Sequence, residues 1–175
     1  MRTASATARR LLVGSGYGCA LLKRKRKTRW GNANGNCYNI LIHIHYVRAD
    51  ALARRIETRY RLLRSPDAPL ISVVTVGEIR AFAAESGWGA GKLQTLEDLL
   101  GYAIAIPIPF ANVIENYVEV SEFSRRAGRV LGKNDLWIAA TAKTTGATLL
   151  TTDKDFDHLA PALLARDWIN PATTT

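Results

Sequence analysis

The feature of this sequence that most constrains its fold is the alternation of short apolar segments with longer helical ones after residue 49. Residues 70–74, 103–109 and 147–151 are short and apolar, and residues 103–109 carry isoleucine at alternate positions, as a strand does. Helical periodicity predicts helices between and around them, at residues 50–63, 75–86, 92–100, 111–130 and 134–145. This alternation is typical of an α/β fold with a mainly parallel central sheet flanked by helices.

Local signals add two predicted helix starts and one ambiguous segment. Thr75-Val76-Gly77-Glu78 has the form of a capping box, and Asn134 is expected to cap the helix that follows it. Residues 40–47 are rich in isoleucine and favour a strand by propensity alone.

The net charge of +9 is concentrated in the first 36 residues. These contain nine of the 24 basic residues and no acid, so the remainder has 24 − 9 = 15 basic and 15 acidic residues, a net charge of zero. Residues 1–36 are therefore expected to be a disordered basic arm, with phosphate binding by residues 23–27 as the alternative. A wrong start or a shifted reading frame is a further explanation for residues 1–38.

Two other features concern where the protein works. The apolar stretch at residues 11–22 is too short to span a bilayer, so no membrane association is expected. Cys19 and Cys37 are the only cysteines, which excludes a disulfide framework and fits a reducing compartment, so the cytoplasm is expected.

Four acids lie near predicted junctions between strands and helices, where the ligand-facing residues of parallel sheets gather. Glu78 and Asp135 are each expected in the first turn of a helix, and Asp153 and Asp155 follow the strand that ends at Thr151. Neighbouring carboxylates repel one another, so a hard cation such as Mg²⁺ or Mn²⁺ would hold them together. Each acid also has a purely structural interpretation, as a capping partner, a helix-dipole charge or a turn residue.

Three residue strings resemble the motifs of PIN domains, and of their VapC toxin branch in particular. ISVVTVGEI (residues 71–79) resembles the segment of the second family acid, GKNDLWIAATA (132–142) that of the third, and LLTTDKDF (149–156) that of the fourth. The resemblance covers about residues 39–170 and implies a PIN-like three-layer α/β fold for residues 37–175. Residues 39–44 resemble the helix after the family's first strand, which makes residues 40–47 helical.

The resemblance also implies a function, a metal-dependent endoribonuclease of the type II toxin–antitoxin kind. Glu78, Asp135 and Asp153 would be catalytic and, with Asp155, would bind Mg²⁺ or Mn²⁺, which activates water for attack on an RNA phosphate. The residues expected to contact the substrate are Asn39, Arg129, Lys133 and Asn134. The expected partners are RNA, a cognate antitoxin that blocks the site, and a second copy of the chain in a homodimer.

The chain departs from the family pattern at its start. Cys37 stands where the family has its first aspartate, Tyr38 where it has a small hydroxyl residue, and residues 34–36 replace the apolar first strand. The first strand is therefore expected to be lost, and the metal site to be weakened, because an unperturbed thiol is mostly protonated at neutral pH. The alternative function is a catalytically impaired PIN-fold protein that only binds antitoxin or RNA.

Overall fold

The computed structural model describes residues 36–38 and 40–172, with side chains from residue 42 onward. The predictions for the basic arm and for Asn39 lie outside the described residues.

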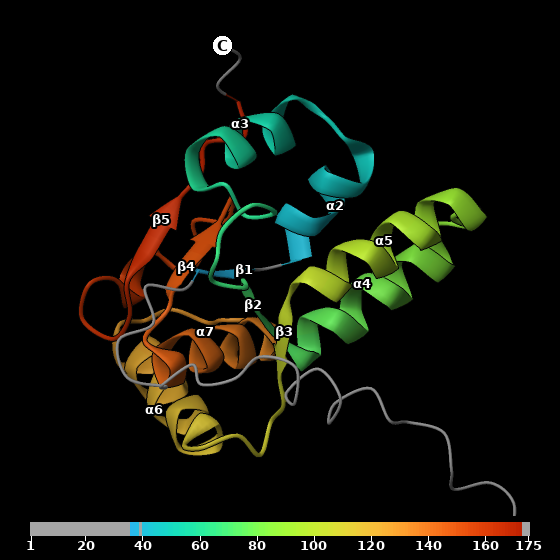
Figure 1. Cartoon of the computed structure of the whole chain (residues 1–175). Helices are drawn as coiled ribbons and strands as arrows, with labels where there is room; N and C mark the ends of the chain where they lie inside the picture. The colour runs from blue at the N-terminus through green and yellow to red at the C-terminus, as the bar shows by residue number, and fades with distance from the viewer. Residues whose placement is uncertain (1–35, 39, 173–175) are drawn as a thin grey trace, which may run out of the picture. The chain divides into compact units, whose positions relative to one another are not determined.

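A sheet of parallel strands forms the middle layer, as the sequence predicts (Figure 1). The strand order within the described part of the chain is β3-β2-β1-β4-β5. The strands are β1 (Asn36–Tyr38), β2 (Leu70–Ser72), β3 (Ile104–Ile106), β4 (Thr148–Thr151) and β5 (Arg166–Trp168). β5 was not predicted, and it adds an edge next to β4.

Helices cover both faces of this sheet, which gives the expected three layers (Figure 1). The helices are α2 (Ile40–Arg48), α3 (Ala51–Tyr60), α4 (Val73–Glu85), α5 (Ala90–Tyr102), α6 (Val113–Arg126), α7 (Lys133–Thr145) and the short 3₁₀ helix η1 (Asp157–Leu159). Successive residues of β4 point to opposite faces: Leu149 packs with the cluster of α6 and α7, whereas Leu150 packs with that of α2 and α3. A third cluster joins α2 to α4 and α5.

The expected loss of the first strand is wrong. β1 lies in the centre of the sheet, and the Cα of Cys37 is in register with Leu70 on one side and Leu149 on the other. Strand pairing uses backbone N–H and C=O groups, which polar residues carry as well as apolar ones. An apolar sequence is therefore not required where two neighbouring strands supply the partners.

Residues 40–47 form a helix, as the family resemblance implies and against their strand propensity. Ile42 is buried in the cluster shared with α3, while Ile44 and Val47 are buried in the cluster shared with α4 and α5. A short helix with apolar contacts on two sides suits this position, and the burial it gains outweighs the β-propensity of its isoleucines.

Both predicted helix caps are wrong. Ser72 caps α4, its Oγ accepting a hydrogen bond from the backbone N–H of Val74 at 3.3 Å, so α4 begins before Thr75 and Glu78 lies in its second turn. Gly132 occupies the cap position of α7. Asn134 lies inside that helix and its side chain is used elsewhere. Among the described residues, no helix is long and apolar enough to cross a membrane.

Candidate metal centre

The four acids singled out in the sequence come from three elements that meet near the ends of β2 and β4. Glu78 lies on α4, which follows β2 directly, and Asp135 lies in the first turn of α7, as expected. Asp153 and Asp155 lie in the loop after β4. Because α7 packs against α4, β1 and β2, residues distant in sequence share one region.

The electrostatics of Asp135 show that these carboxylates influence one another. Its pKa is raised to about 6, first by burial and then by the charges of Asp153, Glu78 and Asp155, against a smaller lowering by the backbone N–H of Gly132. Like charges disfavour ionisation, as does removal from water. Burial and the charges of the three other acids therefore all disfavour ionisation of Asp135.

Gly132 gives Asp135 the room to take this position. A Cβ atom added at Gly132 would lie 2.9 Å from the Oδ2 atom of Asp135. The residue was not singled out in the sequence, because its role depends on the direction of the Asp135 side chain. Its small size lets the backbone and the carboxylate approach each other.

Glu78 is held by Asn134. The Nδ2 of Asn134 donates to Oε1 of Glu78 at 2.5 Å, which ties α4 to α7. The other oxygen, Oε2, is buried and has no hydrogen-bond partner among the described residues. A buried oxygen without a partner is costly, and a cation is one group that would satisfy it.

The loop after β4 is held by its own hydrogen bonds. The N–H of Asp153 donates to Oγ1 of Thr151 at 3.0 Å, and the N–H of Asp155 donates to Oδ1 of Asp153 at 2.8 Å. His158, which sequence reasoning missed, has its Nδ1 2.9 Å from the backbone oxygen of Asp155 and its Nε2 2.8 Å from Oγ of Ser124. The loop is thereby fastened to α6.

The four carboxylates are oxygen ligands of the kind that a hard divalent ion prefers, but their side chains are not arranged around one point. In the part of the chain that the structure describes, no three His, Cys, Asp or Glu side chains are placed to hold one metal together. Carboxylates without a counter-ion repel each other, so a cation would have to draw them inward. With oxygen donors only and the unpartnered Oε2 of Glu78, the residues fit Mg²⁺ or Mn²⁺.

The residues expected to contact substrate are placed as follows. Lys133 and Asn134 are exposed at the start of α7, beside Asp135, and Arg129 is exposed in the preceding loop. Asn134 also supports Glu78. Cys37 is located only by its backbone, in the central strand.

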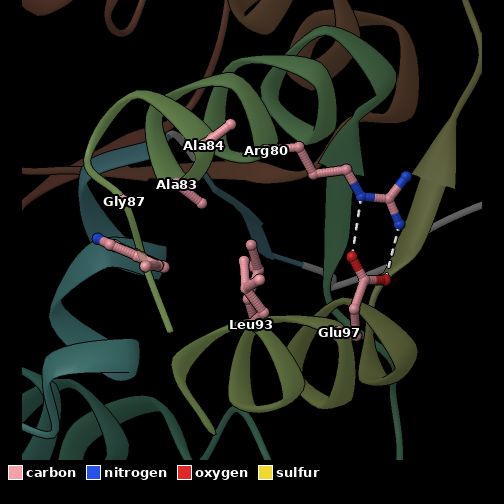
Figure 2. Close-up of a pocket in the computed structure, with 8 residues that line it drawn as sticks. Arg80, Ala83, Ala84, Gly87, Leu93 and Glu97 are labelled. Carbon is pink, nitrogen blue, oxygen red and sulfur yellow. Dashed lines mark hydrogen bonds and ion pairs between the residues drawn. The ribbon is translucent and has the colours of Figure 1, made fainter. Parts of the chain in front are cut away.

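A cavity of about 210 Å³ lies elsewhere, between α4 and α5 (Figure 2). Its wall is mainly apolar, and the guanidinium of Arg80 on α4 makes two hydrogen bonds to the carboxylate of Glu97 on α5, at 3.0 and 2.7 Å (Figure 2). None of the four acids lines it. The cavity is therefore separate from the candidate metal centre.

Comparison with known proteins agrees with this geometry. The family model of the PIN domain matches residues 39–161, more than half of the chain. The chain is 28% identical over 131 residues to Ribonuclease VapC1 of Haemophilus influenzae strain R2866. The matched region covers 74% of this chain and 93% of that relative.

Solved structures agree as well. The structure of VapBC-1 from nontypeable Haemophilus influenzae matches with a TM-score of 0.58 at 25% identity, covering 75% of this chain and 97% of that one. The structure of VapBC2 from Rickettsia felis, bound to a promoter DNA fragment, matches with a TM-score of 0.66 at 20% identity, covering 77% and 98%. The chain therefore belongs to the PIN-domain family, and within that family it is VapC-like.

Proposed function

We propose that this chain is a metal-dependent endoribonuclease of the VapC toxin type, which hydrolyses phosphodiester bonds of RNA. Glu78, Asp135 and Asp153 form its catalytic centre, and Asp155 supports them as a fourth acid. The observation that carries the proposal is the grouping of these acids around Asp135. The pKa of Asp135 is raised to about 6 by burial and by the charges of the other three acids. Groups of carboxylates with raised pKa values are typical of functional sites.

The residues of the chain prepare the site in several ways. Bound Mg²⁺ or Mn²⁺ would supply the activation of water and the orientation of the scissile phosphate. Asn134 fixes Oε1 of Glu78, and Oε2, which has no hydrogen-bond partner among the described residues, would be available to such an ion. Lys133 and Arg129, both exposed near Asp135 in sequence, supply positive charge for the RNA backbone.

The proposed partners are a cognate antitoxin, which would block the carboxylate centre, and a second copy of the chain. The solved structures that this chain resembles include VapBC complexes, one of them described as a member of a toxin–antitoxin family from Mycobacterium tuberculosis. A toxin of this type would act on RNA in the cytoplasm.

A second function has a specific observation in its favour. Cys37 occupies the central strand at the position where the resemblance expects the first aspartate. An unperturbed thiol would bring no negative charge at neutral pH and prefers softer metals than Mg²⁺. The chain would then be a PIN-fold protein that binds antitoxin or RNA without cleaving RNA.

Cleavage of a fluorescent single-stranded RNA in Mg²⁺ or Mn²⁺ separates the two functions. The natural chain is expected to cleave RNA, and Cys37→Asp to do so at least about tenfold faster, since 1.4 kcal/mol of transition-state stabilisation is worth a factor of ten. Asp135→Ala in each background is the control and should abolish cleavage. Cleavage by the Cys37→Asp protein alone would make the natural chain the non-cleaving form. If neither folded protein cleaves RNA, the nuclease proposal fails.

A further inference from the structure

A second cavity, of about 260 Å³, lies between α3 and the edge strand β5. We call it the α3–β5 groove. Arg55, Arg59 and Tyr60 line it from α3, and Trp168 and Asn170 line it from β5 and the residues that follow. No acid is among the described residues that line it, in contrast to the carboxylate centre.

Two guanidinium groups of this groove make hydrogen bonds to neighbouring residues. Arg55 donates to the backbone oxygen of Asn170 at 2.9 Å. Arg59 donates to Oδ2 of Asp167 at 2.8 Å, and its guanidinium carbon lies 5.0 Å from the centre of the Tyr60 ring. These contacts direct both guanidinium groups toward the residues that line the groove.

The charged residues that line the groove, among those the structure describes, are the two arginines. Asp167, at its rim, accepts hydrogen bonds from both Arg59 and the hydroxyl of Tyr60, the latter at 2.5 Å. The side chain of Arg59 is 64% exposed, so N–H donors not used by Asp167 face solvent. The planar fork of a guanidinium matches the oxygens of a phosphate group.

The groove opens at the same end of the sheet as the carboxylate centre. Trp168 is in register with Thr151, two residues before Asp153, on adjacent strands that lie about 4.8 Å apart. The indole N–H of Trp168 donates to the backbone oxygen of Thr152 at 3.0 Å, and the ammonium of Lys154 lies 4.5 Å from its ring centre. Trp168 therefore contacts the acidic loop and lines the groove.

We propose that the α3–β5 groove is a phosphate subsite for single-stranded RNA, in which Arg55 and Arg59 hold the backbone of a nucleotide beside the one that is cleaved. The inference rests on the proposed function for the identity of its ligand. Lys154 supplies a third positive charge along the path from the carboxylates to the groove.

The test is RNA binding by the full chain in EDTA, so that no cleavage is required. The affinity for a short labelled single-stranded RNA is measured by fluorescence anisotropy at several salt concentrations for Arg55→Gln and Arg59→Gln. Arg54→Gln is the matched control, because Arg54 lies on the same helix but bonds to the backbone of Ala49 and does not line the groove. The basic arm is present in the natural chain and in all three variants, so its contribution to RNA affinity cancels in the comparison.

Each groove variant is expected to bind RNA about three- to tenfold more weakly at low salt and to lower the salt slope by about 0.7, as for one lost phosphate contact with a single strand. Arg54→Gln should stay within about twofold of the natural chain. Equal weakening by all three variants would indicate a diffuse basic surface and overturn the subsite, as would no weakening by Arg59→Gln.

Thermal unfolding monitors the integrity of each variant, and Arg59→Gln decides the outcome because its side chain is mostly exposed. Since binding is measured without metal, a chain that uses the groove but never cleaves RNA would refute the nuclease function and leave the subsite standing. A chain that cleaves RNA with the same KM after Arg59→Gln would support the nuclease function and overturn the subsite.

Discussion

At the scale of single residues, Asp135 shows what the acidic centre costs the metal-free protein. Its pKa is raised from 3.8 to about 6 by burial and by three neighbouring acids. A carboxyl group with a raised folded-state pKa contributes stability below its unfolded pKa, and this contribution is lost as the pH rises through the folded-state value. At neutral pH the ionised group therefore lowers the free energy of unfolding when no cation is bound.

Asp135→Asn should relieve this cost. In EDTA at neutral pH we expect the variant to be more stable than the natural chain by about 1 kcal/mol, a value discounted because the group is partly exposed. The difference should vanish below pH ~4, where the natural carboxyl is protonated. Urea unfolding at both pH values measures it, with Asp67→Asn, at an exposed loop residue, as the control. A less stable Asp135→Asn at neutral pH would contradict the repulsion among the acids.

The acids themselves could be predicted from the sequence, whereas their supports could not. Motif strings identify Glu78, Asp135 and Asp153 because each lies in a run of characteristic neighbours. The bond from Asn134 to Glu78 joins residues 56 apart, and no local pattern indicates such a pair. The role of Gly132 depends on the direction of the Asp135 side chain, which only the folded chain reveals.

At the scale of elements, local periodicity predicted α3 to α7 and β2 to β4, with ends shifted by a few residues. The helix α2 was predicted only through the family resemblance, and β1 was expected to be lost. β5 was missed because Arg166-Asp167-Trp168 has no apolar pattern; it is an edge strand, half-buried, and pairs with β4 alone. The start of α4 was misplaced because Ser72 and Thr75 both have the chemistry of a cap. The chain uses the first, since β2 ends there.

This assignment of the cap can be tested by two single substitutions. Ser72→Ala removes the cap of α4 and should lower the free energy of unfolding by about 1 kcal/mol. Thr75→Val should be neutral or slightly stabilising, because the buried Oγ1 of Thr75 has no hydrogen-bond partner among the described residues and removing it ends that cost. Chemical denaturation of both variants gives the comparison. The opposite ranking would restore Thr75 as the cap.

Packing between α4 and α5 can be tested in the same way. Leu96 is buried where the two helices meet α2, with 1% of its surface exposed. Leu96→Ala should destabilise the protein by about 2–4 kcal/mol through lost burial and a residual cavity. Leu93→Ala, on the same helix but 41% exposed, is the control and should cost much less. Similar losses in both variants would mean that α5 is not packed as described.

At the scale of the whole molecule, charge divides the chain unequally. The first 36 residues carry all of the net charge of +9, and the remainder is neutral by count. A variant without residues 2–35 should therefore bind single-stranded RNA with a much weaker salt dependence, the slope falling by about 0.7 for each phosphate contact that is lost. Anisotropy titrations at several salt concentrations measure this. An unchanged slope would show that the arm makes no phosphate contacts.

The position of β1 sets the order in which the domain can be completed during synthesis. Cys37 pairs with Leu149, which the ribosome adds 149 − 37 = 112 residues later. At typical rates of synthesis this interval is roughly ten seconds, and until then the central strand lacks one of its two neighbours. Asp153 arrives later still. A translation product that stops before β4 would therefore lack Asp153 and Asp155 and carry no assembled acidic centre.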